Sequence, residues 1–86
     1  VVLGRLRECV DERAPELAAG HLARSYALQA TGHLKDAREA AAQATAAAPD
    51  DAFAWARLAE LHLTLGERRK ARRAVQRVLR EGDGNG

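Results

Sequence analysis

The stretch AFAWARLAELHLTLGERRKARRAVQRVLREG, residues 52–82, predicts two amphipathic helices joined by a tight turn. Its first half places Trp55 and Leu58 on one helical face, and its second half does the same with Ala71 and Val75. A single glycine separates the halves and tolerates the left-handed conformation that ends a helix. We therefore expect a helical hairpin here, and the rest of the chain can be compared with it.

Residues that end helices recur at a constant distance along the chain. The interval from Pro15 to Pro49 equals that from Gly32 to Gly66 and is about 34 residues. Together with Gly82, these breaks predict five helices, over about residues 1–14, 16–30, 34–48, 52–65 and 67–81. The interval, here termed the repeat period, is typical of helical repeats.

Composition agrees with an all-α chain and limits its size. The 86 residues include 20 Ala and 11 Leu against 5 Val and no Ile, so the strongest helix formers dominate. A chain this short forms one domain, and its size disfavours an enzyme. Cys9 is the only cysteine, and no signal peptide or apolar run of about 18 residues is found, which makes a reducing, cytoplasmic, membrane-free location the default.

The hairpin over 52–82 resembles the tetratricopeptide repeat, a helix–turn–helix unit of about 34 residues. It carries the residues that the family pattern places on the first helix and on the second, namely Trp55, Leu58, Ala59 and His62, then Ala71 and Val75. A second copy over 18–48 is degenerate, but it keeps Ser25, Gly32, Ala37 and the closing Pro49. One further shift makes residues 1–15 the second helix of a preceding unit, so the resemblance covers about two and a half repeats.

The resemblance implies the domain organisation and the overall fold. We expect one domain over residues 1–82, divided into 1–15, 16–49 and 50–82, with a flexible tail over 83–86. Antiparallel helix pairs would stack as a short right-handed α-solenoid. The start at Val1 without an initiator Met suggests a piece of a longer polypeptide.

In this family the first helices of successive units line a concave groove that binds a partner segment. By position, the groove residues here would be Ala19, Leu22, Tyr26, Gln29, Phe53, Ala56, Glu60 and Leu63. The wall is mostly apolar, and it lacks the Lys and Asn residues with which one variant of the family clamps a peptide carboxylate. An amphipathic helix or an extended apolar segment of another protein suits it better. The competing interpretation is that these side chains only pack the interface between repeats.

Positive charge gathers in the last predicted helix. Residues 67–81 hold seven basic and two acidic residues, net +5, whereas the rest of the chain holds seven basic and ten acidic, net −3. An acidic partner, an anionic surface or nucleic acid could contact Arg68, Arg69, Arg72 and Arg73. No aromatic residue is interleaved for base stacking, so we favour a solvated face over nucleic-acid binding.

The same helix carries an apolar stripe that one hairpin cannot cover. Val75, Val78 and Leu79 follow helical spacing and would remain partly exposed at the end of the array. We expect another copy of the chain, or flanking sequence, to cover them, which makes a homo-oligomer one possible assembly.

No constellation for catalysis, metal binding or cofactor binding stands out. His21, His33 and His62 lie on different elements without a shared i, i+4 face, and no second cysteine completes a zinc site. We expect no catalytic residue, metal or cofactor. The sequence predicts a protein–protein interaction module or scaffold, with an anion-binding helix and a structural oligomerisation module as the alternatives.

Overall fold

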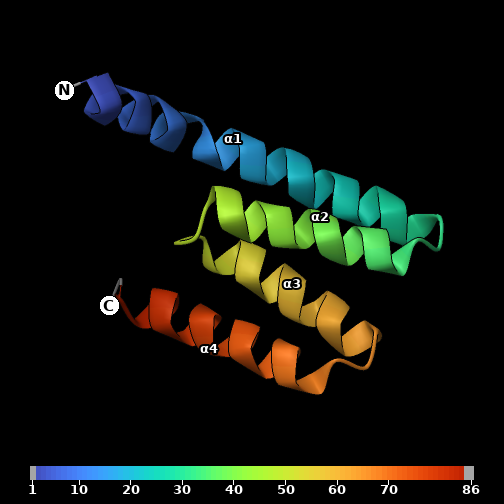
Figure 1. The fold of residues 1–86 in the computed structure, drawn as a ribbon. Coiled ribbons are helices and arrows are strands. Elements are labelled where there is room, and N and C mark those ends of the chain that lie inside the picture. The colour runs from blue at the N-terminus through green and yellow to red at the C-terminus, as the bar shows by residue number, and fades with distance from the viewer. Residues whose placement is uncertain (1, 85–86) are drawn as a thin grey trace.

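Four α-helices and no strand make up the backbone of residues 2–84, the part that the computed structural model describes, with side chains described for residues 16–80. The helices are α1 (Val2–Ala30), α2 (Leu34–Ala47), α3 (Ala52–Thr64) and α4 (Arg68–Gly84), and they lie side by side in chain order (Figure 1). The prediction of an all-α chain is confirmed. The prediction of five helices is wrong.

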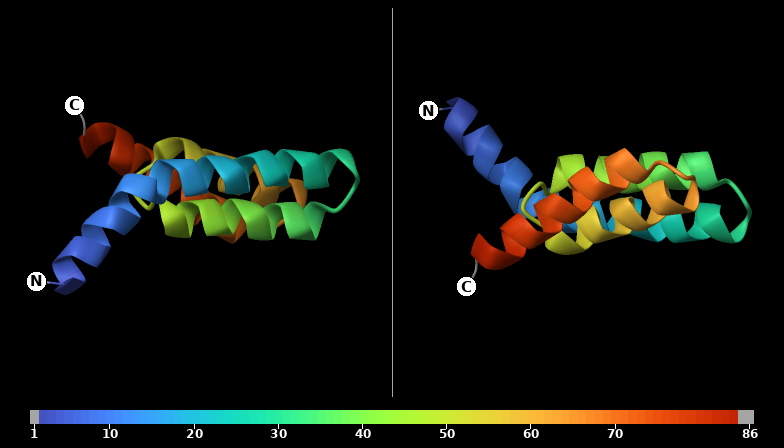
Figure 2. Two further views of the ribbon diagram at one scale, coloured as in Figure 1. Left: turned by 90° about the horizontal axis from the view of Figure 1, so that it is seen from above. Right: turned by 90° about the horizontal axis from the view of Figure 1, so that it is seen from below.

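The missing boundary is the one predicted at Pro15, because α1 runs from Val2 to Ala30 without interruption. Proline removes one hydrogen bond of the helical ladder and favours a kink, but neighbouring residues can carry the helix across it. The ribbon of α1 bends in its N-terminal half (Figure 2). The break predicted at Pro49 does occur, because Asp50 and Asp51 follow it and Asp51 caps the start of a new helix. No capping residue follows Pro15.

The end of α4 also lies later than predicted, at Gly84 rather than before Gly82. Glycine permits the left-handed conformation that terminates a helix, but it equally adopts the helical one. The predicted tail over 83–86 therefore begins inside α4, and residues 85–86 fall outside the described chain. The Cys9 side chain also lies outside the described part of the chain.

The two turns within the hairpins have the same geometry. Gly32 and Gly66 adopt φ values of 82° and 78°, as glycine alone does without strain. At the second turn, the Glu67 amide donates to the His62 carbonyl at 2.7 Å and the Gly66 amide donates to the Leu63 carbonyl at 3.0 Å. This pair of bonds closes the end of α3 and reverses the chain. The predicted break at both glycines is confirmed.

Asp51 sets the start of α3. Its backbone is extended, with φ −90° and ψ 104°, and its Oδ1 accepts a hydrogen bond from the Phe53 amide at 2.9 Å. The side chain thus satisfies a donor that has no partner inside the helix.

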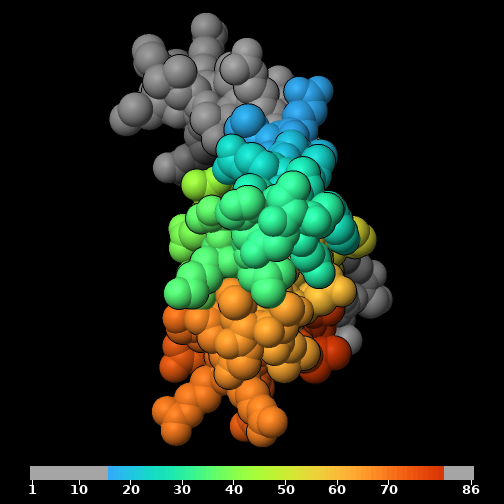
Figure 3. All heavy atoms as spheres, turned by 90° about the vertical axis from the view of Figure 1, so that its right-hand side faces the viewer, coloured from blue at the N-terminus to red at the C-terminus, as the bar shows by residue number. Residues whose placement is uncertain are grey.

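The helices form two antiparallel pairs, α1 with α2 and α3 with α4, and α3 also packs against α2 and touches α1. Figure 3 looks onto the end where the two turns lie one above the other, with extended side chains projecting from the orange segment. Two buried clusters join the pairs across the contact between α2 and α3. The first contains Ala18, Leu22, Ala44, Ala48 and Ala54, and the second contains Ala37, Ala41, Leu58 and Leu61.

Candidate functional site

A shallow hollow of about 270 Å³ opens between α1 and α3. Its lining consists of Tyr26, Phe53, Ala56, Arg57 and Glu60. The Tyr26 side chain is 47% exposed and that of Phe53 is 60% exposed, so two aromatic rings face solvent across the junction of the two pairs. Large exposed aromatic side chains at a concave junction are typical of binding sites.

Arg57 forms the floor of this hollow and is only 3% exposed. Its guanidinium lies 3.8 Å from the centroid of the Tyr26 ring. Its Nε donates to Ser25 Oγ at 3.0 Å, its Nη2 to Gln29 Oε1 at 2.7 Å, and its Nη1 to Glu60 Oε1 at 2.6 Å. A buried cation is stable only when its donors are satisfied, and three acceptors from two helices do so here. The network holds α3 against α1.

This arrangement also fixes the wall of the hollow. The Ser25 hydroxyl, which is fully buried, donates in turn to the Leu22 carbonyl at 2.6 Å. The Tyr26 ring rests on the guanidinium, and the Gln29 amide is bound to it. Side chains that are already ordered lose less conformational entropy when a partner binds. The hollow is therefore preorganised on its α1 side.

The structure brings together four of the eight predicted groove residues. Tyr26, Phe53, Ala56 and Glu60 line the hollow. Gln29 lies behind it, bound to Arg57. The other three lie elsewhere: Leu22 is 8% exposed within the core, Ala19 is exposed without lining the hollow, and Leu63 is 58% exposed on the side of α4.

Arg57 is the residue that the sequence reasoning missed. The arginine inside the run AFAWARLAELHL was a signal, because a charged residue among apolar positions of a helix needs a partner. Two of its three partners, however, belong to α1, 28 and 32 residues earlier in the chain. The hairpin in which Arg57 lies gives no indication of them.

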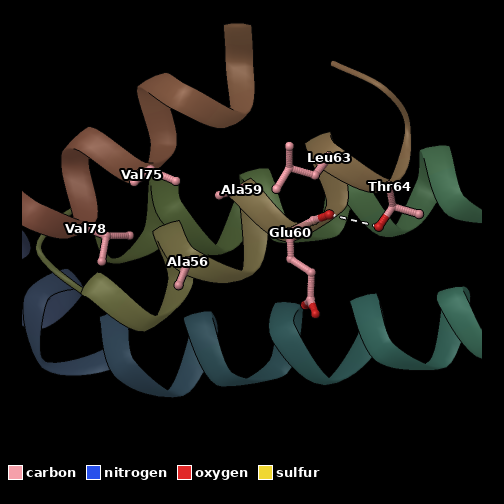
Figure 4. Close-up of a pocket in the computed structure, with 7 residues that line it drawn as sticks. All are labelled: Ala56, Ala59, Glu60, Leu63, Thr64, Val75 and Val78. Atoms are coloured by element: carbon pink, nitrogen blue, oxygen red, sulfur yellow. Dashed lines mark hydrogen bonds between the residues drawn. The ribbon is translucent and has the colours of Figure 1, made fainter. Parts of the chain in front are cut away.

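A second groove, of about 460 Å³, lies between α3 and α4. Figure 4 shows Val75 and Val78 of α4 facing Ala59 and Leu63 of α3, while the Glu60 carboxylate points away from them toward α1. The exposed fractions of 41% for Val75 and 60% for Leu79 agree with the prediction that this stripe remains partly uncovered.

A polar cluster ties the second turn to the first pair. Glu67 Oε2 accepts from Arg38 Nη1 at 2.6 Å, and Glu67 Oε1 pairs with His62 Nδ1 at 2.7 Å. Lys70 Nζ is 3.9 Å from Glu67 Oε2. The hydrogen bond from His62, followed by that from Arg38, holds the pKa of Glu67 below its ordinary value of 4.5. Arg38 belongs to α2, so this carboxylate joins the two pairs.

The basic side chains of α4 lie on the surface. Arg68, Arg69, Arg72 and Arg73 are all exposed, as a solvated face requires. Arg77 instead packs its guanidinium 4.5 Å from the Trp55 ring centroid and donates to the Pro49 carbonyl at 3.2 Å. In the described chain, no three His, Cys, Asp or Glu side chains gather as metal ligands would, and no helix there combines the length and apolarity needed to span a bilayer.

Two antiparallel helix pairs, whose turn glycines Gly32 and Gly66 are one repeat period apart, define this chain as a helical-repeat protein. A family model described as tetratricopeptide repeat matches residues 28–85, more than half of the chain. The chain therefore belongs to the tetratricopeptide repeat family, as the sequence resemblance predicted. Comparison with curated proteins and with solved structures gives no significant match. Repeats of this family generally mediate protein–protein interactions and are non-catalytic.

Proposed function

We propose that this chain is a protein-binding module that holds a helix or an extended apolar segment of another protein in the hollow between α1 and α3. The exposed rings of Tyr26 and Phe53, set over an ordered Arg57, are the observation that carries the proposal. The bound segment would cover both rings, and Glu60 at the edge would accept hydrogen bonds from it.

The proposed arrangement of the array follows from the same contacts. We propose that the pairs form a short right-handed solenoid whose first helices, residues 16–30 of α1 and all of α3, face the partner. In support, α3 touches both helices of the first pair, and Arg57 bonds directly to Ser25 and Gln29 of α1. Successive first helices that touch in this way can present one continuous surface.

A panel of peptides tests the proposal without knowledge of the natural partner. Random 16-residue peptides displayed on phage are selected on the 86-residue protein, and a selected peptide is then titrated by fluorescence anisotropy. Phe53→Ala is expected to weaken binding tenfold or more, because a central aromatic anchor contributes about 2 kcal/mol. Leu17→Ala is the matched control, since Leu17 is 49% exposed on α1 outside the hollow.

Folding and salt dependence separate this function from its alternatives. Phe53→Ala should leave the free energy of unfolding within about 0.5 kcal/mol of wild type, because the ring is mostly exposed. If the ring only packs the repeats, the variant will instead lose stability. Binding to an apolar hollow should change little between 50 and 200 mM salt, whereas four phosphate contacts by α4 would weaken it about a hundredfold.

A further inference from the structure

The groove between α3 and α4 is an apolar concavity of about 460 Å³ that the proposed function does not use. Through Leu63 and Val75 it continues into a neighbouring hollow of about 340 Å³. Ala71 lies on the floor of that hollow, and Arg68 and Arg72 form its edge. Val75 and Val78 line one side of the groove, and they face Ala59 and Leu63 across it (Figure 4). The groove thus has an apolar floor and a basic rim.

The repeat itself shows what such a groove accepts. Ala56, Ala59, Val75 and Val78 lie one repeat period after Leu22, Ser25, Ala41 and Ala44. In the first pair those four earlier residues are at most 8% exposed, because α3 lies over them. Leu58 and Leu61 of α3 share a buried cluster with Ala41, and Ala54 shares one with Ala44. The groove between α3 and α4 is therefore equivalent, one repeat later, to the surface of the first pair that α3 covers. We term this surface the seat.

The arginine of the polar contact beside that seat also recurs one repeat later. Arg38 binds the carboxylate of Glu67, which directly follows the turn after α3. Arg72 lies one repeat period after Arg38, on the rim of the groove, and it is exposed. Within the described residues it forms no ion pair. A helix seated in the groove as α3 sits on the first pair would bring a carboxylate at the position of Glu67 to Arg72.

We propose that the groove between α3 and α4 is a second protein-binding surface, which holds an amphipathic helix of another protein with a carboxylate beyond its C-terminal end paired to Arg72. The surface adjoins the hollow at Tyr26 and Phe53, with which it shares Ala56 and Glu60, but Arg72, Val75 and Val78 belong to this surface alone. The proposal goes beyond the function proposed above, and the two can succeed or fail independently.

A second copy of this chain fits the groove poorly. The residue one repeat period before Glu67 is His33, and the one at the same interval before Leu58 is Arg24. A copy stacked in the manner of α3 would therefore bring a histidine to Arg72 and an arginine to the apolar floor. Both contacts are unfavourable, since neither supplies the carboxylate or the apolar side chain that the seat requires. The occupant is a different helix with an acidic end.

The segment of α3 provides a defined probe. A fluorescein-labelled peptide with the sequence of residues 51–67 and an amidated C-terminus contains Ala54, Leu58, Leu61 and Glu67, and it omits the basic residues that follow. We expect saturable binding to the full 86-residue protein. Arg72→Glu should weaken binding about tenfold, and a peptide carrying Glu67→Lys should prefer the Arg72→Glu protein over wild type. Val75→Glu should abolish binding, since it places a charge on the floor.

Matched variants make the outcome decisive. Arg73→Glu makes the same charge change at an exposed residue of α4 that does not line the groove, and it should leave binding within about twofold of wild type. Phe53→Ala should also leave peptide binding unchanged. Circular dichroism verifies that each variant is folded.

Three results would overturn the proposal. The first is the absence of saturable binding. The second is an equal loss with Arg72→Glu and Arg73→Glu, which would reveal nonspecific charge attraction or exchange of the peptide with the internal α3. The third is a dimer in equilibrium sedimentation that Val75→Glu dissociates, because the groove would then belong to a second copy.

Discussion

The second helices of the two pairs, α2 and α4, occupy equivalent places in the repeat but have different surroundings. α2 packs against both α1 and α3, and its residues Ala37, Ala41 and Ala44 are completely buried. Within the described chain α4 packs against α3 alone, and Val75 and Leu79 remain 41% and 60% exposed. One helix is therefore an internal layer of the array, and the other is a boundary.

The difference shows how the number of neighbours selects the side chains of a helix. A helix enclosed on two sides needs small residues so that both neighbours can approach closely, and α2 is rich in alanine. A helix with one neighbour can carry arginines toward solvent and larger apolar residues beside the contact, as α4 does. The compositions of α2 and α4 thus agree with the number of helices that pack against each one.

The largest expected effect on the free energy of unfolding comes from replacing one of two leucines of α3, of which one faces α2 and the other lies beside α4. Leu61 is completely buried in the cluster with Ala37 and Ala41 of α2, whereas Leu63 is 58% exposed beside α4. Leu61→Ala should lower the free energy of unfolding by about 3 kcal/mol, since it leaves a cavity. Leu63→Ala should lower it by less than about 1 kcal/mol. Urea denaturation followed by circular dichroism measures both, and equal losses would contradict the contrast.

Substitutions at equivalent positions of α2 and α4 test whether the space for a side chain differs between the two helices. Ala41 and Val75 are one repeat period apart, and Ala41 is completely buried. Ala41→Val should destabilise the protein by about 1–3 kcal/mol, because the added methyl groups have no space between α1 and α3. Val75→Ala should change stability by less than about 1 kcal/mol. A stable Ala41→Val protein would show that α2 is not enclosed as described.

The turns are the feature that the two pairs share. Gly32→Ala and Gly66→Ala should each cost about 1 kcal/mol, because both positions have positive φ although no atom lies within 4 Å of an added Cβ. Gly20→Ala should instead stabilise the protein by about 0.5–1 kcal/mol, since Gly20 lies inside α1 with open space around it. Thermal unfolding distinguishes the signs. Opposite effects at Gly32 and Gly66 would show that the turns are not equivalent.

Much of the fold was predictable from local signals. Gly32 and Gly66 act through their own backbone and the next few residues, so their positions alone predicted the two turns. The failure at Pro15 has a local cause too, since proline permits either a break or a kink and no capping residue follows it to begin a new helix.

The candidate site was less predictable because its contacts are distant in sequence. Tyr26 and Phe53 of the predicted groove line one hollow, whereas Leu22, assigned to the same surface, is buried against α2 and α3. Arg57 was missed because two of its three acceptors lie on α1. Helical periodicity identifies a face, whereas the identity of the helix that covers this face depends on tertiary packing.

The smallest expected effect concerns Glu67, which joins α2 to the second turn through its ion pair with Arg38. Because hydrogen bonds from His62 and Arg38 lower its folded pKa below 4.5, the bonds stabilise the protein fully above that pH. The contribution is lost as the pH falls through the lowered folded value. Glu67→Gln should therefore be less stable than wild type at neutral pH and lose less stability on acidification.

Urea denaturation at several pH values between 7 and 3 measures this dependence. Arg38→Gln removes the second cause of the lowered pKa and retains the hydrogen bond from His62, so its acid dependence should fall between those of wild type and Glu67→Gln. An unchanged pH profile in Glu67→Gln would mean that other carboxyl groups govern the acid response. In that case, the bridge between α2 and the second turn would not contribute to a difference in stability between α2, the internal layer, and α4, the boundary.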